Sequence, residues 1–173
     1  MNPIFTIGHS NHPIEVFLGL LQQHAISCVV DVRSVPFSRF YPQFNKERLA
    51  TTLEAGHILY EFEGERLGGR IQDKACFLDR QLPQRKVNVA ELVDYEVLVQ
   101  RDWFIQGVNQ LMERGKTERI AILCSEEQPD RCHRNLLIAR YLLDAGQQVF
   151  HIRGNADAEP ATFRPQAEQM RLL

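Results

Sequence analysis

The chain contains 173 residues, of which 44% are hydrophobic and 24% are charged, and its formal net charge is −2. This composition excludes an intrinsically disordered chain, and the near-balance of charge argues against general electrostatic binding to nucleic acid, which usually shows a basic excess. The length suits a single domain over residues 1–173, and no apolar run approaches the roughly 20 residues that span a bilayer.

The start of the sequence, Met1-Asn2-Pro3, carries no basic segment and no signal-peptide core. We therefore expect a cytoplasmic protein with no membrane partner. The cysteines are expected to be free thiols in that compartment; they are Cys28, Cys76, Cys124 and Cys132. The basic residues are 16 arginines and only 4 lysines, which favours fixed, forked contacts with anions.

Apolar runs and helical periodicity alternate along the chain. In chain order they predict a strand at 4–7, a helix at 14–24, a strand at 27–32, a helix at 46–55, a strand at 57–62, a helix at 90–114, a strand at 119–124, a helix at 132–145 and a strand at 148–152. This order predicts an α/β fold with an open, parallel or mostly parallel sheet of about five strands and helices on both faces. The interval 63–89 lacks a regular period, and we expect it to form an irregular, flap-like insertion.

Ligands of open α/β sheets bind beyond the carboxyl ends of the strands. Three polar loops follow such ends here, at residues 8–11, 31–39 and 124–134. Loops that follow strands are often polar without binding anything, so each loop also has a purely structural interpretation. Their convergence on one edge nevertheless favours a polar site there.

The loop at 124–134 carries the strongest chemical signal, because Cys124 ends a predicted strand and Cys132 and His133 begin a helix. Unpaired backbone N–H groups at a helix N-terminus lower the pKa of a nearby thiol and attract anions. Arg131 and Arg134 would add forked contacts to an anion. Alternatively, Cys132 is a small core residue and Arg134 caps carbonyl groups or pairs with a carboxylate. The spacing from Cys124 to Arg131 is one residue longer than a phosphatase cradle requires.

The other two loops each allow two interpretations. His9 is a candidate general base or a structural histidine. Arg33 either forms a structural brace with Glu126 or Asp31 or points at a ligand. Arg39, which lies among aromatic residues, either stacks on a ligand or belongs to a segment pinned to the body. The set that could bind zinc comprises His9, Cys124, Cys132 and His133, but it lacks paired Cys-x-x-Cys spacing, and the adjacent Cys132 and His133 would rarely bind the same ion. We therefore predict no metal and leave the cofactor open.

Five motifs in order resemble the family called domain of unknown function 488. They are Thr6-Ile7-Gly8-His9-Ser10-Asn11, Asp31-Val32-Arg33 with Pro36 and Ser38-Arg39, Leu67-Gly68-Gly69-Arg70, Asp94-Tyr95, and Cys124-x-Glu126-x-x-Pro129-x-x-Cys132-His133-Arg134. The resemblance runs from about residue 4 to residue 152. It implies a small cytoplasmic α/β protein with a polar site built from these motifs, and it supplies no substrate.

The sequence favours an enzyme that acts on an anionic, phosphate-bearing ligand such as a nucleotide or a nucleic-acid end. Cys124 would be the nucleophile or redox thiol, His9 or His133 would move protons, and Glu126 would orient them. The predicted ligand-binding residues are Ser10, Asn11, Arg33, Ser38, Arg39, Arg70, Cys132 and Arg134. Two alternatives stay open: a module that binds nucleic acid or a partner protein through residues 33–44, and a thiol-redox or metal sensor. The oligomeric state is not indicated.

Overall fold

The computed structural model describes residues 2–83 and 89–162. In these residues, six strands form one sheet in the order β3-β2-β4-β1-β5-β6. The strands are β1 (Ile4–Gly8), β2 (Cys28–Asp31), β3 (Leu59–Phe62), β4 (Ile120–Cys124), β5 (Val149–Ile152) and β6 (Ala158–Pro160). The first five are parallel, and β6 is antiparallel to β5. The predicted mostly parallel α/β sheet is confirmed, with one strand more than the five expected from apolar runs.

The central strands are buried on both sides, which explains their continuous apolar sequences. Every residue of β1, β2 and β4 is buried, whereas β3 lies at the sheet edge and leaves Leu59 exposed. Adjacent residues of β2 serve opposite faces: Val29 packs into one hydrophobic cluster and Val30 into the other. The fold therefore has two cores, one on each side of a single sheet.

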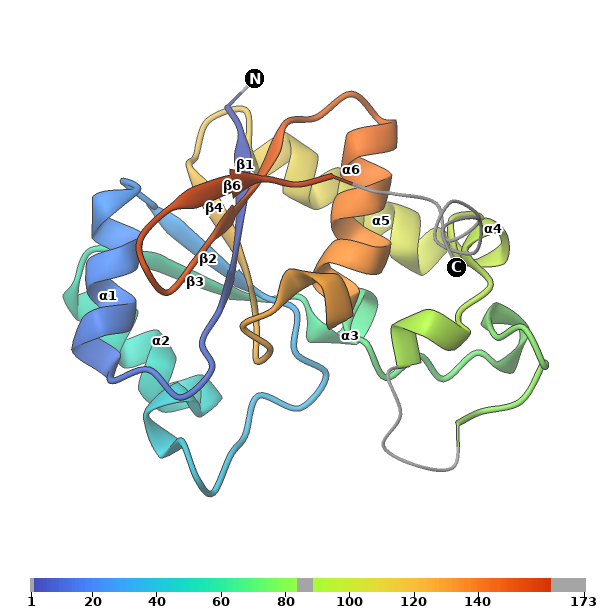
Figure 1. The fold of residues 1–173 in the computed structure, drawn as a ribbon, viewed down its shortest axis with the longest axis horizontal. Coiled ribbons are helices and arrows are strands. Elements are labelled where there is room, and N and C mark those ends of the chain that lie inside the picture. Colours follow the sequence, from blue (N-terminus) through green and yellow to red (C-terminus); the bar gives the residue numbers. More distant parts are fainter. Residues whose placement is uncertain (1, 84–88, 163–173) are drawn as a thin grey trace, which may run out of the picture.

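Helices cover both faces, as predicted (Figure 1). α1 (Ile14–Gln23) and α2 (Lys46–Ala55) pack on the face that contains Val29. α5 (Asp102–Arg114) and α6 (Arg140–Asp144) contribute Val108, Leu111 and Leu142 to the other core. None of the helices in the described part of the chain is long and apolar enough to cross a membrane.

The single helix predicted at 90–114 is wrong. Three shorter helices take its place: η3 (Val89–Leu92), α4 (Tyr95–Leu98) and α5. The Asp94 side chain accepts a hydrogen bond from the backbone N–H of Val97 and so caps α4, and the extended backbone of Arg101 separates α4 from α5. The apolar spacing continues across this break, because all three helices pack against the same core.

The predicted irregular insertion contains short elements over its described residues. α3 (Gly64–Leu67) packs against α5, and η2 (Lys74–Cys76) follows it. Phe77 is buried and pairs with Val93 through an isolated β-bridge. This segment lies beside α4 at one end of the molecule (Figure 1). Residues 84–88 of the predicted flap lie outside the described residues.

The carboxyl ends of β1, β2 and β4 lie side by side, so the loops that follow them meet. Gly8 is in register with Cys124, and Asp31 is in register with Leu123. The backbone N–H of His9 donates to the carbonyl of Cys124 at 3.0 Å. A Cβ atom at Gly8 would collide with the carbonyl oxygen of Glu126, so this glycine allows the loop after β4 to pack directly on the end of β1.

The contact at Gly8 predicts opposite effects for two glycine-to-alanine substitutions. Gly8→Ala forces backbone apart and should destabilise the fold by about 1–3 kcal/mol. Gly19→Ala, in α1, meets no atom within 4 Å and should stabilise by about 0.5–1 kcal/mol, because alanine is the better helix former. Urea denaturation of both variants measures the difference. Equal stability of the two would contradict this account of the loop.

Candidate functional site

A cavity of about 740 Å³ opens beside the carboxyl ends of β2 and β4. Residues from four separate stretches line it: Arg33, Ser34, Val35, Gly69, Arg70, Ala90, Glu91, Cys124, Ser125, Glu126, Arg131, Cys132 and His133. The stretches come from the loops after β2 and β4, the segment after α3, and η3. The cavity therefore joins parts of the chain that are far apart in sequence.

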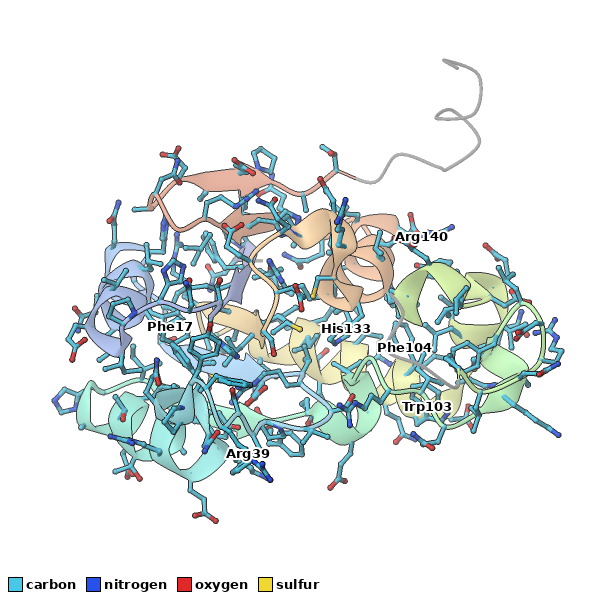
Figure 2. All side chains as sticks on the ribbon, turned by 60° about the horizontal axis from the view of Figure 1, so that its bottom comes forward. Phe17, Arg39, Trp103, Phe104, His133 and Arg140 are labelled. Atoms are coloured by element: carbon cyan, nitrogen blue, oxygen red, sulfur yellow. The ribbon has the colours of Figure 1, made fainter. Side chains whose placement is uncertain are left out.

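His133 lies at the centre of the molecule and is fixed by a backbone carbonyl (Figure 2). Its Nε2 lies 3.2 Å from the carbonyl oxygen of Val32. A carbonyl only accepts hydrogen bonds, so Nε2 carries the hydrogen of the neutral ring and Nδ1 carries a free lone pair. Nδ1 lies 3.7 Å from the sulfur of Cys124 and 3.9 Å from the sulfur of Cys132. His133 is thus oriented to accept a proton from, or share a ligand with, two thiols.

The two cysteines have different acidities because one thiol donates to the other. A hydrogen bond from Cys132 is the main cause that lowers the pKa of Cys124 to about 7, and the charge of Arg134 and backbone groups of Glu126 and Ser125 add to it. Burial, followed by the contact with Cys124, raises the pKa of Cys132 to about 12. Both thiols are free, and Cys124 is the one that ionises near neutral pH.

The Cys132–His133 pair lies at the start of a helix that begins with a wide turn. Residues Pro129–Arg131 form a short 3-10 turn, η4, and the chain is extended at Cys132. η5 (Arg134–Ala139) is π-helical and continues directly into α6. π-helical turns are rare and are often found at functional sites. Here the wide turn follows directly after His133.

Arg33 is buried but does not have a free charge. Its guanidinium donates to both carboxylate oxygens of Asp31, at 2.9 and 2.6 Å, and the Tyr60 hydroxyl donates to the same carboxylate at 2.7 Å. Its remaining nitrogen, Nη1, lies 3.2 Å from Nε2 of His9. These contacts correspond to the structural brace that the sequence left as an alternative for Arg33, although Arg33 also forms part of the cavity wall.

His9 is held neutral in this brace. Its Nδ1 donates to the carbonyl of Ser10 at 2.8 Å, and its Nε2 accepts from Arg33. The ring stacks on Phe44 with 4.3 Å between centroids. Burial and then the positive charge of Arg33 lower the pKa of His9 to about 4. His9 does not line the cavity.

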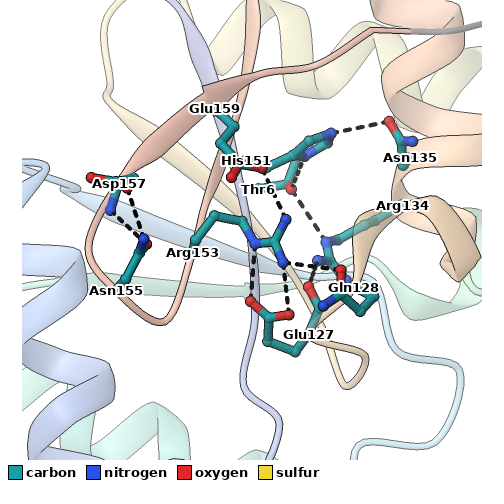
Figure 3. A network of polar contacts seen from close by, with 10 residues as sticks. All are labelled: Thr6, Glu127, Gln128, Arg134, Asn135, His151, Arg153, Asn155, Asp157 and Glu159. Carbon is teal, nitrogen blue, oxygen red and sulfur yellow. Dashed lines mark hydrogen bonds and ion pairs between the residues drawn. The ribbon is translucent and has the colours of Figure 1, made fainter.

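Arg134 is fully buried and holds the loop after β4 in place (Figure 3). Its guanidinium donates to the carbonyls of Glu126 and Glu127 and, at 3.2 Å, to the hydroxyl of Thr6. That hydroxyl lies 2.8 Å from Nδ1 of His151, whose Nε2 contacts Asn135. Arg134 therefore caps carbonyls, which is the structural alternative stated for it, and it does not line the cavity.

The structure brings six of the twelve predicted site residues to one cavity. These are Arg33, Arg70, Cys124, Glu126, Cys132 and His133. The other six do not line it: His9, Ser10, Asn11, Ser38, Arg39 and Arg134. Ser38 instead caps a turn by accepting hydrogen bonds from the backbone of Phe40 and Tyr41, and Arg39 is exposed at the periphery (Figure 2).

The sequence offered both Arg131 and Arg134 as anion contacts and the predicted site kept Arg134, but it is Arg131 that lines the cavity. Ser34, Gly69 and Glu91 are further lining residues that it did not select. Ser34 has a recognisable role, because its hydroxyl accepts from the backbone N–H of Arg70 at 2.8 Å and so joins two cavity loops. The motifs that contain Ser34, Gly69 and Arg131 were visible in the sequence, whereas the direction of each side chain was not.

The Asp31–Arg33 pair predicts a large cost for removing its carboxylate. Asp31→Asn leaves a buried guanidinium without a counter-charge and should destabilise the fold by about 3–5 kcal/mol. Glu113→Gln breaks the ion pair with Lys116, in which the side chains are 70% and 49% exposed, and should change stability little. Urea denaturation at pH 7 compares the two, and a mild effect of Asp31→Asn would show that the brace is dispensable.

The two buried histidines predict that stability decreases in mild acid. The pKa values of His9 and His151 are both lowered to about 4, first by burial and then by neighbouring arginines. Between the ordinary histidine pKa of about 6.5 and this value, the unfolded chain binds more protons, so stability falls as pH falls. Each histidine should cost about 2 kcal/mol at pH 5 relative to pH 7. In His9→Gln, the free energy of unfolding should therefore decrease by about 2 kcal/mol less between pH 7 and pH 5 than in the unmodified protein. Denaturation curves at the two pH values measure this, and an unchanged pH dependence would contradict the assignment.

Comparison with known proteins places the chain in a family. The family described as "Domain of unknown function DUF488" matches residues 13–142. This range contains Cys124, Cys132 and His133, and it confirms the resemblance seen in the sequence motifs. No curated protein and no solved structure matches the chain. Because the match covers well over half of its length, the chain belongs to the DUF488 family.

Proposed function

We propose that this protein is an enzyme that uses the thiol of Cys124 as a nucleophile on a small anionic substrate bound in the cavity. The observation that carries the proposal is the distance of 3.7 Å between the Cys124 sulfur and Nδ1 of His133, at the wall of that cavity. A nucleophile within reach of a base that a third group orients is the arrangement of covalent catalysis. The carbonyl of Val32 is the orienting group here.

The proposed reaction has two steps, and His133 carries a proton in each of them. Cys124 transfers its proton to Nδ1 of His133, and its sulfur forms a bond to the electrophilic atom of the substrate. The bond from that atom to the leaving group breaks, the leaving group keeps the electron pair, and it takes the proton from His133. Water then attacks the same atom while His133 takes a proton from it. The bond from sulfur to that atom breaks, and His133 returns the proton to the sulfur, which restores the thiol.

Arg70 and Arg131 are the groups that support an anionic substrate. Both are exposed residues on the cavity wall, and guanidinium groups form forked contacts with carboxylates and phosphates. Two arginines of the predicted set, Arg33 and Arg134, already donate to Asp31 and to backbone carbonyls, and a third, Arg39, does not line the cavity. Glu126 also lines the cavity, which favours a substrate that presents a hydrogen-bond donor beside its anionic group.

Two alkylating agents of different charge test this proposal without a known substrate. Iodoacetate carries a carboxylate, whereas iodoacetamide is neutral. In reduced, chelator-treated protein, the ratio of the two alkylation rates should favour iodoacetate about tenfold more at Cys124 than at free cysteine, because Arg70 and Arg131 can form forked contacts with the carboxylate. Arg70→Met and Arg131→Met should each reduce this preference, and His133→Asn should slow both reagents. Peptide mass spectrometry locates the modified residue.

Arg39→Met is the matched control, since Arg39 is an exposed arginine that does not line the cavity. It should leave both rates unchanged. A preference equal to that of free cysteine, or faster modification of Cys132 than of Cys124, would refute the proposal.

A second candidate function uses the loop at residues 33–44. Phe37 is 63% exposed and Phe40 is 87% exposed, and Arg39 lies between them. Exposed aromatic and arginine side chains on one loop favour docking of a partner protein or stacking on nucleic-acid bases. Phe37, Arg39 and Phe40 do not line the cavity, so the two functions do not exclude each other.

A further inference from the structure

The three groups that face each other in the cavity are also a set of metal ligands. The sulfurs of Cys124 and Cys132 and a ring nitrogen of His133 all lie within 4.8 Å of one another. We propose that these residues bind one zinc ion, with the fourth coordination position open to the cavity. The proposal does not rest on the nucleophilic role of Cys124.

The distances between the ligand atoms already approach those of a zinc site. Zinc–sulfur bonds of about 2.3 Å and zinc–nitrogen bonds of about 2.0–2.1 Å at a tetrahedral angle place sulfur and nitrogen about 3.6 Å apart. The observed separations from Nδ1 are 3.7 Å to Cys124 and 3.9 Å to Cys132. Displacements of a few tenths of an ångström therefore bring both nitrogen–sulfur distances to the tetrahedral value, and the two sulfurs already lie within 4.8 Å of each other.

The surroundings of His133 satisfy a second requirement of metal sites. A ligating histidine usually donates its other ring N–H to a carbonyl or carboxylate, which fixes the ring and its tautomer. Nε2 of His133 has this partner in the carbonyl of Val32, at 3.2 Å. The lone pair of Nδ1 is consequently directed to the two sulfurs before any ion arrives.

Access and ligand number determine the class of site. All three ligands line the cavity, which provides the entry path. Three protein ligands with an open fourth position are typical of zinc sites that bind water or an exogenous ligand, whereas structural sites use four protein ligands. Binding releases the two thiol protons and oxidises nothing: each thiolate and Nδ1 donates an electron pair to the ion.

Zinc competes with alkylating reagents for the sulfur of Cys124. Coordination occupies one lone pair of the thiolate and withdraws negative charge from it, so its nucleophilicity falls. The ion would therefore slow the reactions of Cys124 until it is removed. Competition of this kind connects the cavity to the supply of zinc, and it makes protection of Cys124 a direct readout of occupancy.

Cobalt and zinc titrations of the full chain under reducing conditions test the site. Cobalt should bind one ion per chain and produce sulfur-to-cobalt charge transfer with the visible bands of a tetrahedral centre. Zinc should displace it and slow the alkylation of Cys124 by both reagents. His133→Ala and Cys132→Ser should weaken binding by more than about 100-fold, beyond the loss typical of a missing second-shell partner.

Cys76→Ala is the control, because Cys76 is a buried free cysteine outside the cavity; its affinity for zinc should equal that of the unmodified protein. Binding that survives Cys132→Ser, a stoichiometry other than one, or octahedral cobalt spectra would overturn the proposal. Circular dichroism confirms that each variant is folded. If zinc does not bind, the alkylation of the metal-free protein still tests the nucleophilic role of Cys124. If iodoacetate is not preferred, the metal titration still tests the zinc site, so the two proposals fail separately.

Discussion

The site depends on one buried guanidinium. Arg134 has no exposed surface, and its nitrogens donate to two carbonyls of the loop after β4 and to a hydroxyl of β1. A buried charge is costly unless its hydrogen-bonding groups are satisfied, so the loop is required to bring those carbonyls inward. Cys124 begins this loop, and Cys132 and His133 immediately precede Arg134. The same interaction therefore fixes both ends of the segment that carries the chemistry.

The network around Arg134 extends this constraint across the sheet. Thr6 and His151 come from neighbouring strands, β1 and β5, and Asn135 comes from the same helix as Arg134. On the outer side, Arg153 pairs with Glu127 at 2.9 Å (Figure 3). Polar networks of this kind confer a unique geometry when every member is satisfied. The loop is thus held from inside by its carbonyls and from outside by a carboxylate.

Patterns that depend on burial were predictable from the sequence, and those that depend on side-chain direction were not. The strands around Val29 and Ile122 were identified because strands buried on both faces are continuously apolar. The break at Arg101 was missed, since a single extended residue does not interrupt the apolar spacing of the helices beside it. β6 was missed because it is three residues long and only partly buried, so it has no apolar run.

In the site, sequence reasoning identified the correct loops and could not assign each residue within them. Convergence follows from topology, because parallel strands place their carboxyl ends at one edge. The backbone conformation of residues 129–134 buries Arg134 and leaves Arg131 on the cavity wall. Both residues are arginines, so residue type alone could not distinguish them. The orientation of His133 depends on the carbonyl of Val32, and any residue at position 32 would supply that carbonyl.

The π-helical stretch at 134–139 marks a place where the chain contains one residue more than a regular helix needs. Removing a residue there would restore α-helical geometry while leaving α6 and its core contacts in place. The wide turns absorb the extra residue locally, so the helix keeps its orientation on either side of them. The extra residue is thereby accommodated while His133 stays at the cavity wall and Leu142 stays in the core.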